Sequence, residues 1–296
     1  MSLVTLHVGS AGLSIAPECG GSIARYWRDL GDHTIEWLRP AVPGALERRD
    51  PLGMACFPLV PYSSLIRLGR FTFQGRQVSL PLNFAPSRHS IHGHGWKRPW
   101  SVVNSTTTAA TIEYRHRSDE WPWPYRAEQR FELRPERMSI RMSVTNEGRE
   151  PMPAGLGPHP YFVRTPTARL TAAADRIWLN DRELLPTELV APPPEYDLRG
   201  GIHPVRIGMD HCFAAWNRRA TIDWPEWHAR LEMIAEAPLD FLVVYTPPDT
   251  DHFCVEPVSN ITDAFNLTAA GRIDTGMRVL QPGETLTAVA HFEPHV

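Results

Sequence analysis

Alternation of hydrophobic and polar residues is the clearest pattern in this chain. From Met138 to Thr145, apolar and polar side chains occupy every second position. Period-two alternation is typical of a β-strand with one buried face and one solvated face. Phe131 and Leu133 precede this run across the tetrapeptide 134–137, so the pattern predicts a β-hairpin.

Short apolar runs separated by Gly and Pro occur along the whole chain. We expect further strands at Leu3–Val8, Leu13–Ala16, Ile23–Trp27, Leu231–Ile234, Phe241–Tyr245 and Thr285–Phe292, and a hairpin turning at Gly75 within Arg70–Val78. Helical periodicity is nearly absent, although Leu184–Val190 could form a turn or two. Because there is no βαβ rhythm and no fixed-period repeat, the pattern predicts an all-β fold, a large antiparallel β-sandwich. No shift in composition divides the chain, so we expect residues 1–296 to form a single domain.

Composition and charge narrow the classes of function. The formal net charge of −3 gives no electrostatic reason to expect nucleic acid or an anionic membrane as a partner. The start of the chain lacks the basic and apolar segments of a signal peptide, and no apolar run is long enough to cross a bilayer. The cysteines are scattered and indicate reduced core residues: Cys19, Cys56, Cys212 and Cys254. We therefore expect a soluble, cytoplasmic monomer or homodimer.

Two distant stretches offer groups for acid–base chemistry. His159 stands between Pro158 and Pro160, which restrict the backbone, so we expect a stiff connection there and not regular structure. Glu256 follows an apolar run and precedes Pro257, which is typical of the last residue of a buried strand. Burying a carboxylate is costly unless it has a partner or a function. An imidazole and a carboxylate in such settings could form an acid–base pair.

Three histidines lie close together at His89, His92 and His94. On a strand, His92 and His94 would share one face, a spacing that suits a metal ion. No Asp, Glu or Cys follows nearby to complete a ligand shell, so a glycine-rich surface turn is an alternative. We favour a third interpretation, in which a histidine donates a hydrogen bond to an oxygen-rich ligand beside Trp96 and Trp100.

Other polar and aromatic stretches allow more than one interpretation. The run Trp121–Tyr125 alternates aromatics with prolines and could make a flat platform for a sugar ring, although such aromatics more often pack in the core. Asp210 precedes an apolar stretch, where it could cap a turn. Asp249, Asp251 and His252 indicate a solvated turn.

These motifs together resemble the aldose 1-epimerase (galactose mutarotase) family. The matching blocks lie in family order over most of the chain: Pro61–Ser63, Gly69–Phe73 with Gly75, Ile91–Trp96, Gly157–Phe162, Asp210–Phe213, Val255–Pro257 and Asp263–Asn266. The combination of His-Pro-Tyr-Phe with a late Glu-Pro is fairly specific. The resemblance implies a broad antiparallel β-sandwich with an open cleft for an aldose, and no cofactor. Because the histidine cluster lacks a carboxylate or thiolate partner in sequence, we also expect that no metal is required.

The resemblance also implies roles for single residues. His159 matches the general acid of the family and Glu256 the general base. His92 matches a second active-site histidine, and Asp210 matches the acidic residue that holds sugar hydroxyls.

One departure from the family concerns substrate recognition. Family members usually carry an Asn-Arg pair where this chain has Ser64 and Leu65. The arginine that would contact the sugar is therefore missing, unless Arg67 or Arg70 reaches in. We expect Arg67 and Trp96 to complete the substrate-binding residues.

The implied activity is interconversion of the anomers of an aldose. A base takes the proton of the anomeric hydroxyl while an acid protonates the ring oxygen, and each transfer supplies roughly 10²–10⁴ in rate. A non-catalytic sugar-binding or sensing protein on the same scaffold is the alternative, and Leu65 is a change compatible with lost turnover. A glycoside hydrolase would usually need two carboxylates, and only Glu256 has a persuasive setting. The presence of both His159 and Glu256 favours the isomerase.

Overall fold

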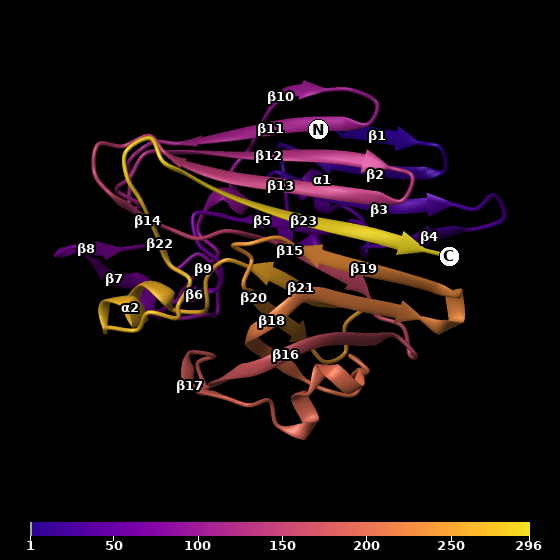
Figure 1. Cartoon of the computed structure of the whole chain (residues 1–296). Helices are drawn as coiled ribbons and strands as arrows, with labels where there is room; N and C mark the ends of the chain where they lie inside the picture. The colour runs from indigo at the N-terminus through magenta and orange to yellow at the C-terminus, as the bar shows by residue number, and fades with distance from the viewer. Residues whose placement is uncertain (1) are drawn as a thin grey trace.

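Antiparallel strands form a large β-sandwich in the computed structural model, which describes residues 2–296 (Figure 1). The predicted all-β fold is thereby confirmed. The helices are short, α1 (Ala45–Arg48) and α2 (Ala264–Ala269). Single 3-10 turns lie at Pro51–Gly53, Arg67–Gly69, Gly95–Lys97, Pro194–Tyr196, Leu198–Gly200 and Pro225–Trp227. No helix of residues 2–296 is long and apolar enough to span a membrane.

One layer of the sandwich starts at an edge strand and continues through antiparallel neighbours. In spatial order these are β10 (Ser101–Ser105), β11 (Ala109–His116), β12 (Tyr125–Arg134), β13 (Arg137–Asn146), β23 (Thr285–His295) and β19 (Ala229–Ala235). The predicted hairpin is β12–β13, with Arg134 opposite Arg137 at its turn. Along β13, Met138 and Ile140 are buried whereas Arg141 is exposed, as the alternation predicts.

The long strand β18 (Met209–Trp224) carries the sheet into the second layer. Its C-terminal half pairs with β19 and its N-terminal half pairs with β20. The order then continues through β20 (Phe241–Thr246), β21 (His252–Val258), β15 (Gly157–Val163), β5 (Cys56–Leu59), β3 (Ser22–Asp29), β2 (Ala11–Ala16) and β1 (Val4–Val8). The strand β4 (Thr34–Glu36) pairs with β3, and β16 (Arg169–Asn180) lies along the other side of β18. Because the sheet folds over, β1 and β2 contact β12, and Leu13, Phe131 and Ile140 are buried in the core.

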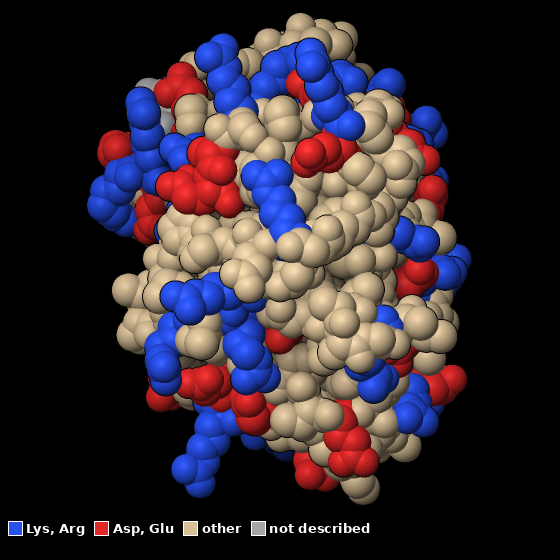
Figure 2. All heavy atoms as spheres, turned by 90° about the vertical axis from the view of Figure 1, so that its left-hand side faces the viewer, with Lys and Arg blue, Asp and Glu red and all other residues tan. Residues whose placement is uncertain are grey.

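Small two-stranded ladders cover one end of the sandwich, at the left of Figure 1. They are β6 (Leu65–Ile66) with β9 (Ser90–Ile91), β7 (Arg70–Phe73) with β8 (Arg76–Ser79), and β14 (Met152–Ala154) with β22 (Arg278–Leu280). The β7–β8 hairpin turns at Gly75, which has a φ of 82°, as predicted. Basic and acidic side chains are interspersed over this end (Figure 2), so this face carries no continuous basic surface.

The predicted helical turn at Leu184–Val190 is wrong. Residues Pro186–Val190 form strand β17, which pairs with the edge of β16. Pro186 is the first residue of this strand, where a missing N–H is tolerated. The free edge of a neighbouring strand therefore determines the conformation of a segment whose own pattern is weak.

Candidate active site

A cavity of about 230 Å³ lies where β15, β20 and β21 approach the segment 84–92. Its lining includes His92, His159, Asp210 and Glu256. The structure thus brings together four residues that come from four separate parts of the chain.

His159 lies inside strand β15, so the expectation of an irregular connection is wrong. Tyr161 donates its backbone N–H to the Ala55 carbonyl at 2.9 Å, so the odd-numbered residues of β15 turn their N–H groups toward β5. The backbone nitrogens of Pro158 and Pro160 face away from β5, toward the side of β21. On that side β21 pairs only with residues 161–163 of β15. A proline removes no ladder hydrogen bond at such a position.

Asp210 and Glu256 also lie within strands, Asp210 as the second residue of β18 and Glu256 inside β21. The register places Asp210 opposite Tyr245, and Val243 opposite Glu256. Side chains directly opposite each other, and those two apart along a strand, share one face of a sheet. All four of these side chains accordingly line the cavity. Glu256 does not end its strand as predicted, because Pro257 continues β21.

His92 is held by two hydrogen bonds in a left-handed backbone conformation with a φ of 58°. Its N–H donates to the Ser64 carbonyl at 2.9 Å, and the Ser64 N–H donates to His92 Nδ1 at 3.0 Å. Because Nδ1 accepts a hydrogen bond, the neutral ring must carry its proton on Nε2. Burial lowers the pKa of His92 to about 3, so the ring stays neutral and offers Nε2–H as a donor.

His159 and Glu256 form a buried pair in the cavity wall. His159 Nε2 lies 3.3 Å from Glu256 Oε1. The imidazole stacks between Phe57 and Tyr161, whose ring centroids lie 4.4 and 4.9 Å from its own. These aromatic contacts fix the plane of the imidazole and leave its ring nitrogens at the edges.

Burial sets the charge state of this pair. It raises the pKa of Glu256 well above its ordinary value, with a contribution from the Asp210 charge. It lowers the pKa of His159 well below its ordinary value, with a contribution from His92. Both shifts disfavour a charged form, because a buried ion loses its hydration. Glu256 Oε2 and His159 Nδ1 have no hydrogen-bond partner among the described residues. The hydroxyl groups of a polyhydroxylated ligand can supply the missing hydrogen bonds.

Asp210 and Trp96 lie in the lining of the same cavity. Burial raises the pKa of Asp210 to about 6, so its carboxyl group takes both protonation states near neutral pH. The Trp96 ring stacks on Phe57 at a centroid distance of 5.2 Å, and its N–H donates to the Gly93 carbonyl.

The structure corrects the expectation that Arg67 reaches the ligand. Its Nε lies 3.7 Å from Asp263 Oδ2, and its side chain is not part of the cavity lining. Arg70 is exposed on β7, outside this cavity. Leu65, at the place of the family arginine, does line the cavity. Among residues 2–296, no lysine or arginine contributes to that lining.

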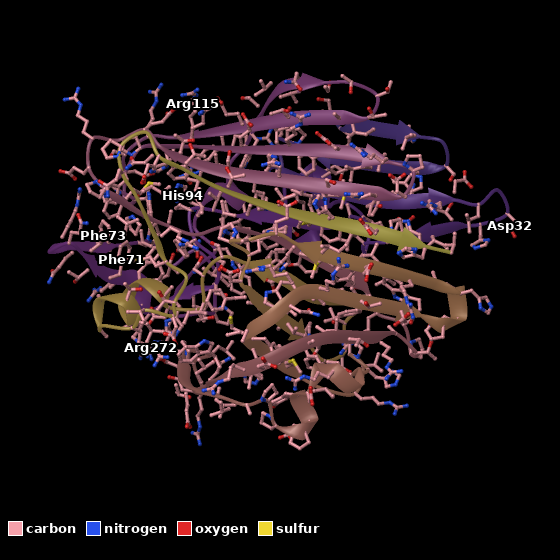
Figure 3. The ribbon with its side chains drawn as sticks, in the orientation of Figure 1. Asp32, Phe71, Phe73, His94, Arg115 and Arg272 are labelled. Carbon is pink, nitrogen blue, oxygen red and sulfur yellow. The ribbon has the colours of Figure 1, made fainter. Side chains whose placement is uncertain are left out.

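The three clustered histidines point to different places. His89 Nδ1 accepts the backbone N–H of Leu68 at 3.0 Å. His94, labelled in Figure 3, has its Nε2 2.9 Å from the Tyr125 hydroxyl and lines a second cavity of about 300 Å³. That larger cavity is lined by neither His159 nor Glu256, so of the three histidines only His92 belongs to the candidate site.

The aromatic run Trp121–Tyr125 belongs to the core. Its three rings are buried, and Trp121 packs against Phe71 of β7, which Figure 3 labels. The core interpretation is correct, and the run does not line the cavity of His159. Asp249 and Asp251 are exposed, as expected for a solvated turn, whereas the expectation is wrong for His252, which is half-buried as the first residue of strand β21.

The ligand-type atoms of His92, His159 and Glu256 lie within 4.8 Å of one another, a spacing compatible with a metal ion. The hydrogen bond from the Ser64 N–H to His92 Nδ1 argues against a metal ion at this position. A metal-bound imidazole gives one lone pair to the ion and carries its proton on the other nitrogen. His92 Nδ1 faces a backbone N–H and has no room for a proton. The geometry therefore favours a hydrogen-bonding site.

We expect zinc to leave the Tm of the protein unchanged after treatment with a chelator. A ligand that binds only the folded state raises stability by RT ln(1 + [L]/Kd), so a metal site would be visible as a concentration-dependent rise. Differential scanning fluorimetry over a zinc titration measures this. A rise that disappears in His159→Asn would establish a metal site and overturn the argument from His92.

Sequence reasoning missed two side chains that line the cavity beside His159 and Glu256. Phe57 and Tyr245 line the cavity, but in the sequence each is an apolar residue in a strand-like run. The one available signal was Tyr161, which belongs to the His-Pro-Tyr-Phe motif and stacks on His159.

The fold and the cavity define a galactose mutarotase-like β-sandwich. The aldose 1-epimerase family model matches residues 2–293, and the chain belongs to this family. The predicted family is thereby confirmed.

Similar proteins are known from several bacteria. The chain is 32% identical over 296 residues to the uncharacterized protein YphB of Escherichia coli K12, with 97% of each covered. A solved structure from Escherichia coli K12, named "Putative aldose 1-epimerase", superposes with a TM-score of 0.89 at 30% identity, covering 99% of both chains. A galactose mutarotase-like protein from Clostridium acetobutylicum has a TM-score of 0.88 at 21% identity, covering 99% of this chain and 95% of that one.

Proposed function

We propose that this protein interconverts the α and β anomers of an aldose, with Glu256 as general base and His159 as general acid. The supporting observation is the distance of 3.3 Å between His159 Nε2 and Glu256 Oε1 in the cavity wall. The anomeric hydroxyl and the ring oxygen are bonded to the same carbon. An acid and a base that exchange protons with these two oxygens must therefore both reach the same small acetal group, and the short separation of this pair meets that condition.

In the proposed mechanism, Glu256 takes the proton of the anomeric hydroxyl while His159 protonates the ring oxygen. The bond between C1 and the ring oxygen breaks, and the former anomeric oxygen becomes the aldehyde oxygen. Rotation about C1–C2 presents the other face of the carbonyl, and closure reverses both transfers. His92 donates its Nε2–H to the ring oxygen, where charge develops. Asp210 accepts hydrogen bonds from sugar hydroxyls. This chemistry uses no cofactor.

The proton count of the pair is the same on both sides of ring opening. Carboxylate with imidazolium and carboxylic acid with imidazole differ only in the location of one proton. Burial favours the uncharged form, which is the form that remains after the ring has opened. Sugar hydroxyls that donate to Glu256 Oε2 would stabilise the carboxylate that starts the reaction.

Exchange spectroscopy by NMR on a panel of aldoses tests this proposal. We expect the α/β exchange of at least one sugar to be faster than in buffer. The absence of lysine and arginine from the lining among the described residues favours one alternative, a non-catalytic sugar-binding protein. Binding of a sugar without accelerated exchange of any sugar would establish that alternative.

The pH dependence of kcat/KM should be flat through pH 6.5, the ordinary pKa of histidine. Activity requires one transferable proton on the pair, and the lowered pKa of His159 delays entry of a second proton to more acidic pH. The raised pKa of Glu256 retains the one proton through neutral pH, so the alkaline limb lies well above the ordinary glutamate value. Exchange rates corrected for the uncatalysed reaction measure the profile. An acid limb centred at the ordinary histidine pKa would contradict this assignment.

A further inference from the structure

The cavity of His159 has a polar side and an apolar side. The polar side is formed by His92, His159, Asp210 and Glu256. The apolar side is formed by Leu52, Leu65, Phe84, Ile91 and Leu184. Leu52 and Leu184 are 38% and 43% exposed, so the apolar side extends to the mouth of the cavity.

Leu65 and Ile91 place this apolar surface next to the His92 donor. They lie directly opposite each other in the β6–β9 ladder, so their side chains share a face. Leu65 follows Ser64, whose N–H holds His92 Nδ1, and Ile91 precedes His92 in the chain. The apolar pair and His92 therefore belong to the lining of the same cavity.

The lining contains acidic side chains but neither lysine nor arginine. Glu183, Asp210 and Glu256 contribute carboxyl groups, and no lysine or arginine of residues 2–296 belongs to the lining. Arg88, outside the lining, is paired with Glu183 at 3.1 Å. A phosphate or carboxylate on the ligand would lie beside these carboxyl groups without a lysine or arginine to pair with.

We infer that the substrate is a neutral 6-deoxy aldohexose whose methyl group packs against Leu65 and Ile91. The inference rests on the proposed function, in which His92 donates to the ring oxygen. C5 is bonded to that oxygen, so its exocyclic carbon lies inside the same small cavity, whose lining includes Leu65 and Ile91. A hydroxymethyl group there would lose water against two side chains that offer neither donor nor acceptor, whereas a methyl group needs neither.

The experiment compares sugars that differ only at C6. The galactose and glucose series each supply the parent sugar, its 6-deoxy analogue, its 6-phosphate and its uronic acid. We expect kcat/KM for anomer exchange to be about 10–100-fold higher for a 6-deoxy sugar than for its parent, the scale of one small group in an apolar pocket. The phosphate and the uronic acid should not be accelerated.

Variants of the apolar side separate its role from that of the acid–base pair. Leu65→Gln should reduce the preference for the 6-deoxy sugar, since the amide offers partners to a hydroxyl. Leu184→Gln, at the exposed mouth, provides the same test at a site that folding depends on less. Leu82→Gln is the matched control, because Leu82 is 56% exposed and lies outside the cavity lining.

The outcomes distinguish this inference from the proposed function. Exchange of parent and 6-deoxy sugars at equal rates in both series would overturn the inference and leave the mutarotase activity standing. Acceleration of the phosphate or uronic acid to the rate of the neutral sugar would also overturn it. No acceleration of any sugar would overturn the proposed function itself. A 6-deoxy preference that falls in Leu65→Gln or Leu184→Gln, but not in Leu82→Gln, supports the inference.

Discussion

Replacement of Glu256 by glutamine is expected to lower kcat for anomer exchange by about 10²–10⁴-fold, the contribution of one positioned general base. The amide keeps the shape of the side chain but accepts no proton at neutral pH. Burial already favours the uncharged form of Glu256, so the substitution removes no buried charge. We therefore expect the variant to fold with an unchanged or raised Tm. NMR exchange rates and the Tm measure the two effects separately.

The controls for this prediction use the same chemical change elsewhere. Glu236→Gln alters a surface glutamate that lies 3.1 Å from His291, and should leave exchange unchanged. His159→Asn should lower kcat on the same scale as Glu256→Gln. Because the two residues act as a unit, the double variant should be no slower than the slower single variant. Wild-type exchange by Glu256→Gln would show that the base is another group.

Strands with one buried and one solvated face could be predicted from the sequence because their side chains alternate. The run 138–145 lies within β13, and the terminal run 285–292 lies within β23. Strand β17 could not be predicted in this way, since its conformation depends on pairing with β16 and its own residues do not alternate clearly. The local hydrophobic pattern shows which face of a strand is buried. Whether a segment pairs with the edge of another strand depends on the fold of the whole chain.

The position of the site depends on long-range strand order that no local pattern contains. His159, Asp210 and Glu256 converge because β15, β21, β20 and β18 are successive neighbours in the sheet. The family resemblance named these residues, but their own sequence context predicted turns and connections. That context was misleading at Pro158 and Pro160, because their missing N–H groups face a side without a paired strand.

Arg67 illustrates how a nearby charge can fail to replace a lost one. Its backbone N–H donates to Asp263 Oδ1 at 2.9 Å, and its guanidinium Nε lies 3.7 Å from Oδ2 of the same residue. These contacts tie Arg67 to the start of helix α2, outside the cavity. Proximity in sequence to Leu65 thus does not place a cation at the site, because the direction of a side chain follows from its tertiary partners.

His92 offers a test that separates hydrogen-bond donation from proton transfer. Its backbone φ of 58° is a conformation that asparagine also adopts readily, whereas a β-branched residue would be strained there. Asparagine is therefore the substitution that removes the imidazole with the least change in the backbone. His228 has a similar φ of 49° and is exposed, so His228→Asn is a matched control.

We expect His92→Asn to lower kcat and kcat/KM alike, by about 10²–10³-fold, the loss found when one donor to a developing charge is removed. The shape of the pH profile should not change between about pH 5 and 8, the range in which histidine ordinarily titrates. The pKa of His92 is about 3, so its ring does not titrate there. A shift of the acid limb in His92→Asn would mean that His92 itself exchanges protons. Exchange within a few-fold of the wild-type rate would show that the ring oxygen does not depend on Nε2–H, and the positioning of Leu65 and Ile91 beside that oxygen would lose its basis.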